Sequence, residues 1–145
     1  ADVRIAYTGG FGDIAKASEL AKAQIDAGAD VLTGTAQQTV GAIKATAEKP
    51  GVYWLGNDMD QSSLAPDTVL SAQVYNWKGV VMQMINFRKD GKVGGEHITL
   101  SLKSGDISLS FNPKTSSVIP ADVMALVEKA KTDIISGALV IELPK

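Results

Sequence analysis

The sequence predicts an α/β fold with a doubly wound parallel sheet. Short runs of β-forming residues alternate, in the first half of the chain, with segments whose apolar residues recur at helical spacing. The connections between these runs are about a dozen residues or longer, which is the length that a crossover between parallel strands needs. Because such crossovers share one hand, we expect the first three strands to end at one edge of the sheet.

The first unit begins with a β-type run at residues 3–7 and continues into a glycine turn at residues 8–13. Asp13 suits the N-cap of a following helix, and Gly28 suits the position just beyond its end. We therefore expect a helix over about residues 14–27. The apolar positions that indicate it are Ile14, Ala17, Leu20, Ala21 and Ile25.

Three more β-type runs follow, at residues 29–35, 52–55 and 68–74. The helix between the first two of these is indicated by Val40, Ile43 and Ala47. A further helix is predicted to start near Trp77 and to end near Gly91. We expect Trp77 and the methionines of that helix in the core, because they share its apolar face.

The pattern changes near residue 95, where apolar and polar residues alternate at residues 97–102 and 107–111. This alternation is typical of a hairpin or of two short strands. Pro120 then opens an amphipathic helix that ends at Gly137, and residues 140–143 predict a short terminal strand. We divide the chain into residues 1–75, with the βα units and ligand loops, and residues 76–145, with the later helices and hairpin.

Composition excludes several classes of function. The chain has 145 residues, 45% of them apolar, and a net charge of -2, which suits an ordinary α/β core. Its lysines and arginines are scattered, so neither nucleic acid nor an anionic membrane surface is an expected partner. No apolar run approaches the ~20 residues that a membrane span needs. Since the sequence has no cysteine, disulfides, thiol catalysis and cysteine-bound metals are excluded.

Motifs that indicate catalysis or a cofactor are missing from the sequence. His97 is the single histidine, and no nucleophile lies near it along the chain. Gly9, Gly10 and Gly12 do not have the spacing of a dinucleotide-binding turn. We therefore expect a recognition site with no catalytic residue, no metal and no cofactor, and we do not expect an enzyme.

A polar loop follows the apolar run at residues 52–55 and carries Asp58 and Asp60. In an extended backbone, alternate side chains point the same way, so both carboxylates would lie on one side. The loop lacks the glycine and the glutamate of a calcium loop, although a metal and a solvated turn both remain alternatives. A ligand loop is favoured because ligands bind at the carboxyl ends of parallel strands.

Aromatic and amide side chains follow the other two strands. Phe11 lies on the glycine turn, where it could stack on a planar ligand or fold back over the helix as a hydrophobic plug. Gln37 and Gln38 could contact a ligand or could simply begin the next helix. Tyr75 ends the fourth β-type run and is a further candidate for the pocket.

Several motifs together resemble the basic membrane protein family of substrate-binding lipoproteins, of the kind that binds purine nucleosides for ABC importers. The motifs are Tyr-Thr-Gly-Gly-Phe-Gly-Asp at residues 7–13, Asp-Ala-Gly-Ala-Asp-Val at residues 26–31, Gly-x-Asp-x-Asp-Gln at residues 56–61, Leu-Ala-Pro-Asp-Thr-Val-Leu at residues 64–70 and Asp-Ile-Ile-Ser-Gly at residues 133–137. They occur in family order over essentially the whole chain.

The resemblance implies a periplasmic-binding-protein type I lobe, the carboxyl-terminal part of a two-lobe protein that clamps its ligand between the lobes. The aromatic at Phe11 would stack on the purine, and the carboxylate of Asp58 would hold the ribose hydroxyls. The implied partners are a purine, an ABC permease and an amino-terminal lobe, on which residues 76–145 would partly pack. The implied location is periplasmic or otherwise outside the cytoplasm, with a lipidated cysteine upstream.

Two positions depart from the family pattern. Many members have Ala-Gly-Gly where this chain has Ala36, Gln37 and Gln38, and a lysine where it has Tyr75. The ending Gln-Val-Tyr-x-Trp at residues 73–77 resembles a branch associated with free purine bases. The sequence thus predicts a purine ligand and leaves nucleoside and nucleobase open, with a ligand-sensing regulator and a nucleoside-acting enzyme as rival functions.

Overall fold

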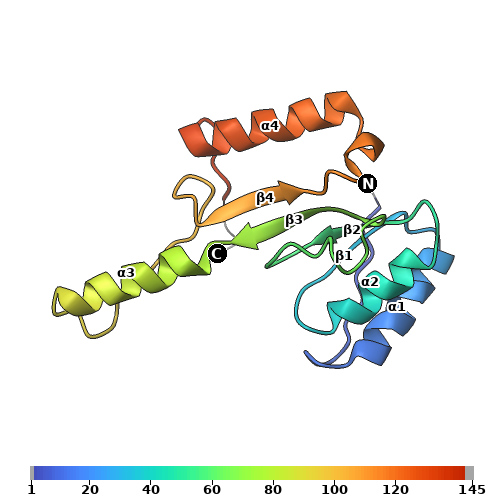
Figure 1. Cartoon of the computed structure of the whole chain (residues 1–145), viewed down its shortest axis with the longest axis horizontal. Helices are drawn as coiled ribbons and strands as arrows, with labels where there is room; N and C mark the ends of the chain where they lie inside the picture. Colours follow the sequence, from blue (N-terminus) through green and yellow to red (C-terminus); the bar gives the residue numbers. More distant parts are fainter. Residues whose placement is uncertain (1, 143–145) are drawn as a thin grey trace. The chain divides into compact units, whose positions relative to one another are not determined.

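The computed structural model of the chain describes residues 2–142 and has the predicted α/β character (Figure 1). The chain divides into two compact units. The first contains Ala1–Gln73 and Leu109–Val118, and the second contains Val74–Ser108 and Ile119–Lys145. Two of the boundaries between the units fall within strands, namely β3 (Val69–Tyr75) and β4 (Ile107–Phe111).

The strands in the described part of the chain form one sheet in the order β1-β2-β3-β4. Strand β1 pairs in parallel with β2, and β2 pairs in parallel with β3, which confirms the parallel sheet. The residue ranges are β1 Val31–Thr33, β2 Tyr53–Gly56, β3 Val69–Tyr75 and β4 Ile107–Phe111.

Helices begin and end close to where capping residues predict. Helix α1, Ile14–Asp26, starts at Asp13, whose carboxylate accepts a hydrogen bond from the Lys16 amide at 2.8 Å. Gly28 has a φ of +94°, a conformation that glycine adopts without strain. The remaining helices are α2 Thr39–Ala47, α3 Trp77–Lys89, a short 3₁₀ turn η1 Ser116–Val118, and α4 Ala121–Ser136, which ends at Gly137.

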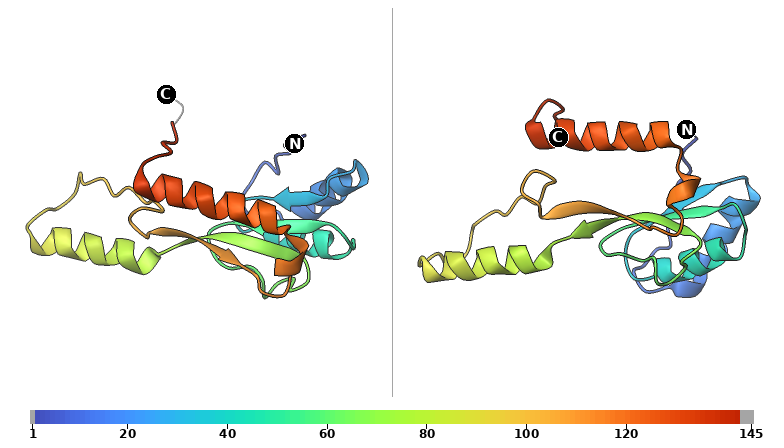
Figure 2. Two further views of the ribbon diagram at one scale, coloured as in Figure 1. Left: turned by 90° about the horizontal axis from the view of Figure 1, so that it is seen from above. Right: turned by 45° about the horizontal axis from the view of Figure 1, so that its top comes forward.

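The core of the first unit lies between the sheet and the helix pair α1 and α2, which lie side by side in every view (Figure 2). Ile43 of α2 and Trp54 of β2 are almost completely buried in it. The indole N–H of Trp54 donates a 2.8 Å hydrogen bond to Oε1 of Gln61, so this buried polar group is satisfied. That bond also fixes the polar loop after β2 to the core.

Residues 3–7 do not form the strand that the sequence predicts. They are extended, but they pair with no strand in the described part of the chain, and Val3, Ile5 and Tyr7 are exposed. Side-chain bonds hold the segment instead: the Arg4 guanidinium donates to the Ala27 carbonyl, and Thr8 Oγ1 accepts from Gln38 Nε2. These bonds tie the segment to the residues just before and just after β1, but not to the strand itself.

The predicted hairpin is half correct. Residues 107–111 form β4, whereas residues 97–102 form no strand. Ser101 and Ser104 explain the difference, because each hydroxyl accepts a hydrogen bond from the backbone N–H of the other residue. These local bonds occupy backbone donors that a strand ladder would use.

Two other predictions about the second unit are wrong. Trp77 and Met84 of α3 are more than half exposed, and Val80 is the buried residue of that helix, so the tryptophan and methionines are not core. Residues 140–142 form no strand, because nothing in the described part of the chain pairs with them. Leu143, the last residue of the predicted strand, lies outside the described residues.

Candidate functional site

Phe11 projects from the loop between residues 8 and 13, which leads directly into α1. Gly9 has a φ of +78°, so the turn uses the conformational freedom of glycine. The Phe11 side chain is 75% exposed and therefore does not fold back over α1 as a plug. An exposed aromatic ring held between a capped helix and a tight turn is suited to stacking on a planar ligand.

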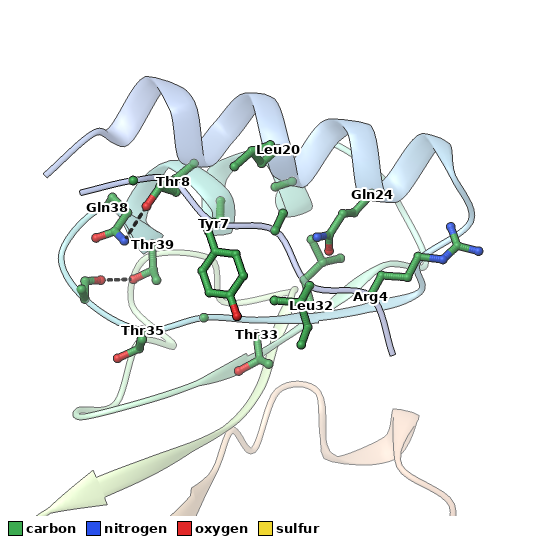
Figure 3. Close-up of a pocket in the computed structure, with 18 of the residues that line it drawn as sticks. Arg4, Tyr7, Thr8, Leu20, Gln24, Leu32, Thr33, Thr35, Gln38 and Thr39 are labelled. Atoms are coloured by element: carbon green, nitrogen blue, oxygen red, sulfur yellow. Dashed lines mark hydrogen bonds between the residues drawn. The ribbon is translucent and has the colours of Figure 1, made fainter. Parts of the chain in front are cut away.

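Gln38 joins this loop to the start of α2. Its backbone N–H donates to the Phe11 carbonyl at 3.2 Å, and its side-chain Nε2 donates to Thr8 Oγ1 at 3.2 Å (Figure 3). Gln38 is the N-cap residue of α2, yet its side chain makes no capping bond. It is buried, and its Oε1 has no hydrogen-bond partner among the described residues. The structure thus brings Phe11 and Gln38 together.

Gln37 lies one residue earlier, exposed in the turn between β1 and α2. The preceding residue, Ala36, has a φ of +73°, which is strained for a residue with a Cβ. The strained residue therefore lies directly before the exposed Gln37. The turn follows the carboxyl end of β1, where ligands bind in parallel sheets.

Asp58 lies in the loop after β2, as Gln37 lies in the turn after β1. It is exposed and has a φ of +76°. Its backbone N–H donates a 2.9 Å hydrogen bond to Oδ1 of Asn57. Strands β1 and β2 are parallel neighbours, and Thr33 pairs with Leu55, so both loops leave the same edge of the sheet. Ala36 and Asp58 are the non-glycine residues with positive φ in the described part of the chain. Such strain clusters at functional sites.

Tyr75 ends β3 and belongs to the second compact unit. It is half-buried, and its ring packs against Trp77 with centroids 5.3 Å apart and planes tilted by 38°. The structure therefore supports Tyr75 from the first residue of α3. The first unit carries the other four candidates, which are Phe11, Gln37, Gln38 and Asp58.

Thr8 and Asn57 are positioning residues that the sequence did not single out. Thr8 Oγ1 donates to the Gly10 carbonyl at 2.8 Å while it accepts from Gln38, so it shapes the Phe11 loop. Asn57 Oδ1 shapes the turn at Asp58 in the same way. Threonine or asparagine just before a turn is a recognised signal for such local bonds, and it could have identified both residues.

We also searched residues 2–142 for a metal site and for a membrane-spanning helix. No group of histidine, aspartate and glutamate side chains there could hold a metal ion. No helix in this part of the chain is long and apolar enough to cross a membrane. The surroundings of Asp58 and Asp60 thus offer no metal-ligand cluster among the described residues.

The family described as "ABC transporter substrate-binding protein PnrA-like", named Bmp, matches residues 1–143. The chain belongs to this family. Among relatives of this Bmp-family chain is an ABC transporter nucleoside-binding protein of Lactococcus lactis, 31% identical over 96% of the chain and 43% of the relative. Another is a purine-binding protein of Brucella abortus, 30% identical over 94% of the chain and 37% of the relative. The chain spans about two fifths of the length of such relatives.

Solved structures support the same fold. One is a solute-binding protein of an ABC transporter system from Aeropyrum pernix, with a TM-score of 0.82 and 24% identity. The aligned region covers all of the Bmp-family chain and 49% of the Aeropyrum pernix chain. Another is a transcriptional activator of the comK gene from Bacillus halodurans, with a TM-score of 0.77 and 23% identity. The aligned region covers 94% of the Bmp-family chain and 47% of the Bacillus halodurans chain. At these identities the likeness shows the fold alone.

Proposed function

We propose that this Bmp-family chain is part of a solute-binding protein that captures a purine nucleoside or nucleobase and delivers it to an ABC permease. The observation that carries the proposal is the exposed Phe11 ring, held on a loop that Gln38 joins to the start of α2. The names of two relatives, a nucleoside-binding protein and a purine-binding protein, support the same ligand class.

Each candidate residue has a role in this proposal. Phe11 stacks on the purine ring, and the amides of Gln37 and Gln38 bond the edge of the base. The Asp58 carboxylate accepts hydrogen bonds from ribose hydroxyls, each worth about 1.5–3 kcal/mol because the acceptor is charged. Tyr75, at the end of β3, is a further candidate contact, with a phenol where many members have a lysine. The ligand is bound and released without chemical change.

Lobe closure is the mechanism of capture. A second lobe closes over the ligand, buries the base against Phe11 and presents both lobes to the permease. Residues 76–145 partly pack on that lobe, which is consistent with the exposed apolar residues of α3, including Trp77 and Met84. The protein acts outside the cytoplasm and is anchored by a lipidated cysteine in polypeptide beyond these residues.

Replacement of Phe11 by alanine should weaken purine binding by about 1–3 kcal/mol, the range for loss of base-aromatic stacking. This corresponds to a roughly 5- to 150-fold higher Kd. Calorimetric titration of the longest polypeptide that the gene encodes would measure it. Phe11→Tyr is the matched control, because it keeps the ring and should keep the affinity. An unchanged Kd in Phe11→Ala would contradict a stacking role.

Asp58→Asn tests whether the ligand is a nucleoside. Asparagine tolerates a positive φ, so the variant should keep the backbone of this turn while it loses the charged acceptor. If Asp58 holds ribose, adenosine binding should weaken by about 1.5–3 kcal/mol while adenine binding stays the same. Equal weakening of both ligands, or of neither, would remove the ribose role. Tighter binding of adenine than adenosine by the unmodified protein would favour the nucleobase.

A further inference from the structure

The side chain of Gln38 is buried, yet only one end of its amide is hydrogen-bonded. The residue is 8% exposed, and its Nε2 donates to Thr8 Oγ1 at 3.2 Å. Its Oε1 has no hydrogen-bond partner among the described residues. The place of Gln38 at the start of α2 does not explain this acceptor, because the side chain makes no capping bond. A buried acceptor without a donor is costly, so this one indicates a partner from outside the chain.

Thr8 fixes which end of the Gln38 amide is left over. Its hydroxyl donates to the Gly10 carbonyl at 2.8 Å, so its one proton is used and it can only accept from Gln38. A flipped amide would set Oε1 against a hydroxyl oxygen that has no proton left to give. Nε2 therefore faces Thr8, and Oε1 lies on the far side of the amide (Figure 3). The group that remains for a partner is an acceptor and never a donor.

This acceptor lies next to the aromatic ring of the candidate site. The backbone N–H of Gln38 donates to the Phe11 carbonyl at 3.2 Å, which makes the two residues neighbours. Both also line one cavity of about 620 Å³, together with Thr8 and Gly10. Because the Phe11 ring is exposed, a planar ligand can stack on it and bring one edge toward Gln38.

The turn beside Gln38 is built so that it can move when a ligand arrives. The segment from Thr8 to Phe11 is bonded to Gln38 at both of its ends, and Oε1 is not accessible to water. Gly9 and Gly10 lie between these two bonds, and a Cβ built on either one meets no atom within 4 Å. A shift of the turn therefore breaks no packing at the two glycines, and it opens the acceptor to the ligand edge.

We propose that Gln38 Oε1 determines specificity, and that it selects purines with an N–H donor on the edge of the six-membered ring. The inference rests on the proposed function and goes beyond it, because it gives the amide a fixed polarity and names the group that the ligand must carry. The 6-amino group of adenine and the N1–H of hypoxanthine are donors of this kind. A purine with a methyl or methoxy group at position 6 has no such donor.

Burial makes the selection by Gln38 strong. A ligand with the donor satisfies Oε1, whereas a ligand without it leaves the acceptor unpaired and out of reach of water. Sites that hydrogen-bond a ligand group reject analogues without that group more strongly than an apolar pocket rejects a missing methylene. Gln37 is exposed, so water can satisfy whichever part of its amide the ligand does not use. We therefore expect Gln38, and not Gln37, to discriminate between the ligands.

Calorimetric titration of the longest polypeptide that the gene encodes tests the proposal with two pairs of ligands. Adenine is compared with 6-methylpurine, and hypoxanthine with 6-methoxypurine, each as the free base and as the riboside. In the pair that binds more tightly, the member with the donor should have a Kd at least about tenfold lower. Equal Kd values within both pairs would overturn this inference and leave the proposed function standing. No binding of any of these purines would overturn both.

Variants of Gln38 assign the preference to this residue. Gln38→Met removes the amide at similar side-chain length, and the two members of the pair should then differ by no more than about twofold in Kd. Gln38→Glu should retain the preference, because a neutral carboxyl group offers an O–H to Thr8 and keeps an acceptor in place of Oε1. Gln83→Met on α3, in the second unit, is the matched control and should leave every Kd unchanged. A preference that survives in Gln38→Met would show that another group selects the donor, which overturns the proposal.

Discussion

Gly41→Ala should destabilise the chain by about 3 kcal/mol or more, because α1 and α2 touch at this position without room for a methyl group. A Cβ on Gly41 would lie 2.1 Å from the carbonyl oxygen of Ile14 and 2.9 Å from its Cγ2. The carbonyl is backbone in the first turn of α1, so the methyl group can be accommodated only if one helix moves away from the other. Chemical denaturation followed by circular dichroism would measure the loss.

Gly12→Ala is the matched control for Gly41→Ala. No atom lies within 4 Å of a Cβ built on Gly12, and its φ lies outside the left-handed region. Its free energy of unfolding should therefore stay within about 0.5 kcal/mol of the original. A Gly41→Ala protein as stable as the Gly12→Ala protein would show that the two helices are further apart than the structure has them.

Asn112→Ala should cost about 2–4 kcal/mol, since its buried side chain satisfies several backbone groups of the first unit. The amide Nδ2 donates to the carbonyls of Pro66 and Val69 at 2.8 and 2.7 Å. Its Oδ1 accepts from the Lys114 amide at 3.0 Å. The variant leaves the Pro66 carbonyl without this donor, whereas the Val69 carbonyl keeps the bond from Thr115.

Asn86→Ala is the comparison for this variant, because Asn86 is exposed on α3, where alanine is a good helix former. Thermal unfolding should show a clearly lower Tm for Asn112→Ala and little change for Asn86→Ala. If the two Tm values fall together, the Asn112 network contributes no stability.

The local part of the fold could be predicted from the sequence. Asp13, Gly28 and Gly137 mark helix ends through bonds and backbone angles that depend on neighbours in the chain, and all three predictions are confirmed. The parallel order of the strands follows from the length of their connections. Such features need no knowledge of distant contacts.

The errors arise where a partner from elsewhere in the molecule decides the outcome. Residues 3–7 have the side chains of a strand, but a strand exists only with a hydrogen-bonded neighbour, and the described residues supply none. The apolar face of α3 is real, yet a periodic face indicates burial only if another surface covers it. Gln38 was identified as a candidate from its place after a strand, whereas its bond to Thr8 depends on residues far apart in sequence.

The hydrogen bond between Trp54 and Gln61 fixes the far end of the loop that follows β2. The residues inside that loop can therefore vary while the fold stays the same. Residues 57–60 lie between β2 and the half-buried Gln61, whose side chain is bonded to the buried Trp54, so substitutions there change what the loop presents without disturbing the core. A lineage could therefore exchange one ligand for another by altering this short loop alone. Selection would be expected to keep Trp54 and Gln61 together as a pair while the residues between β2 and Gln61 diverge.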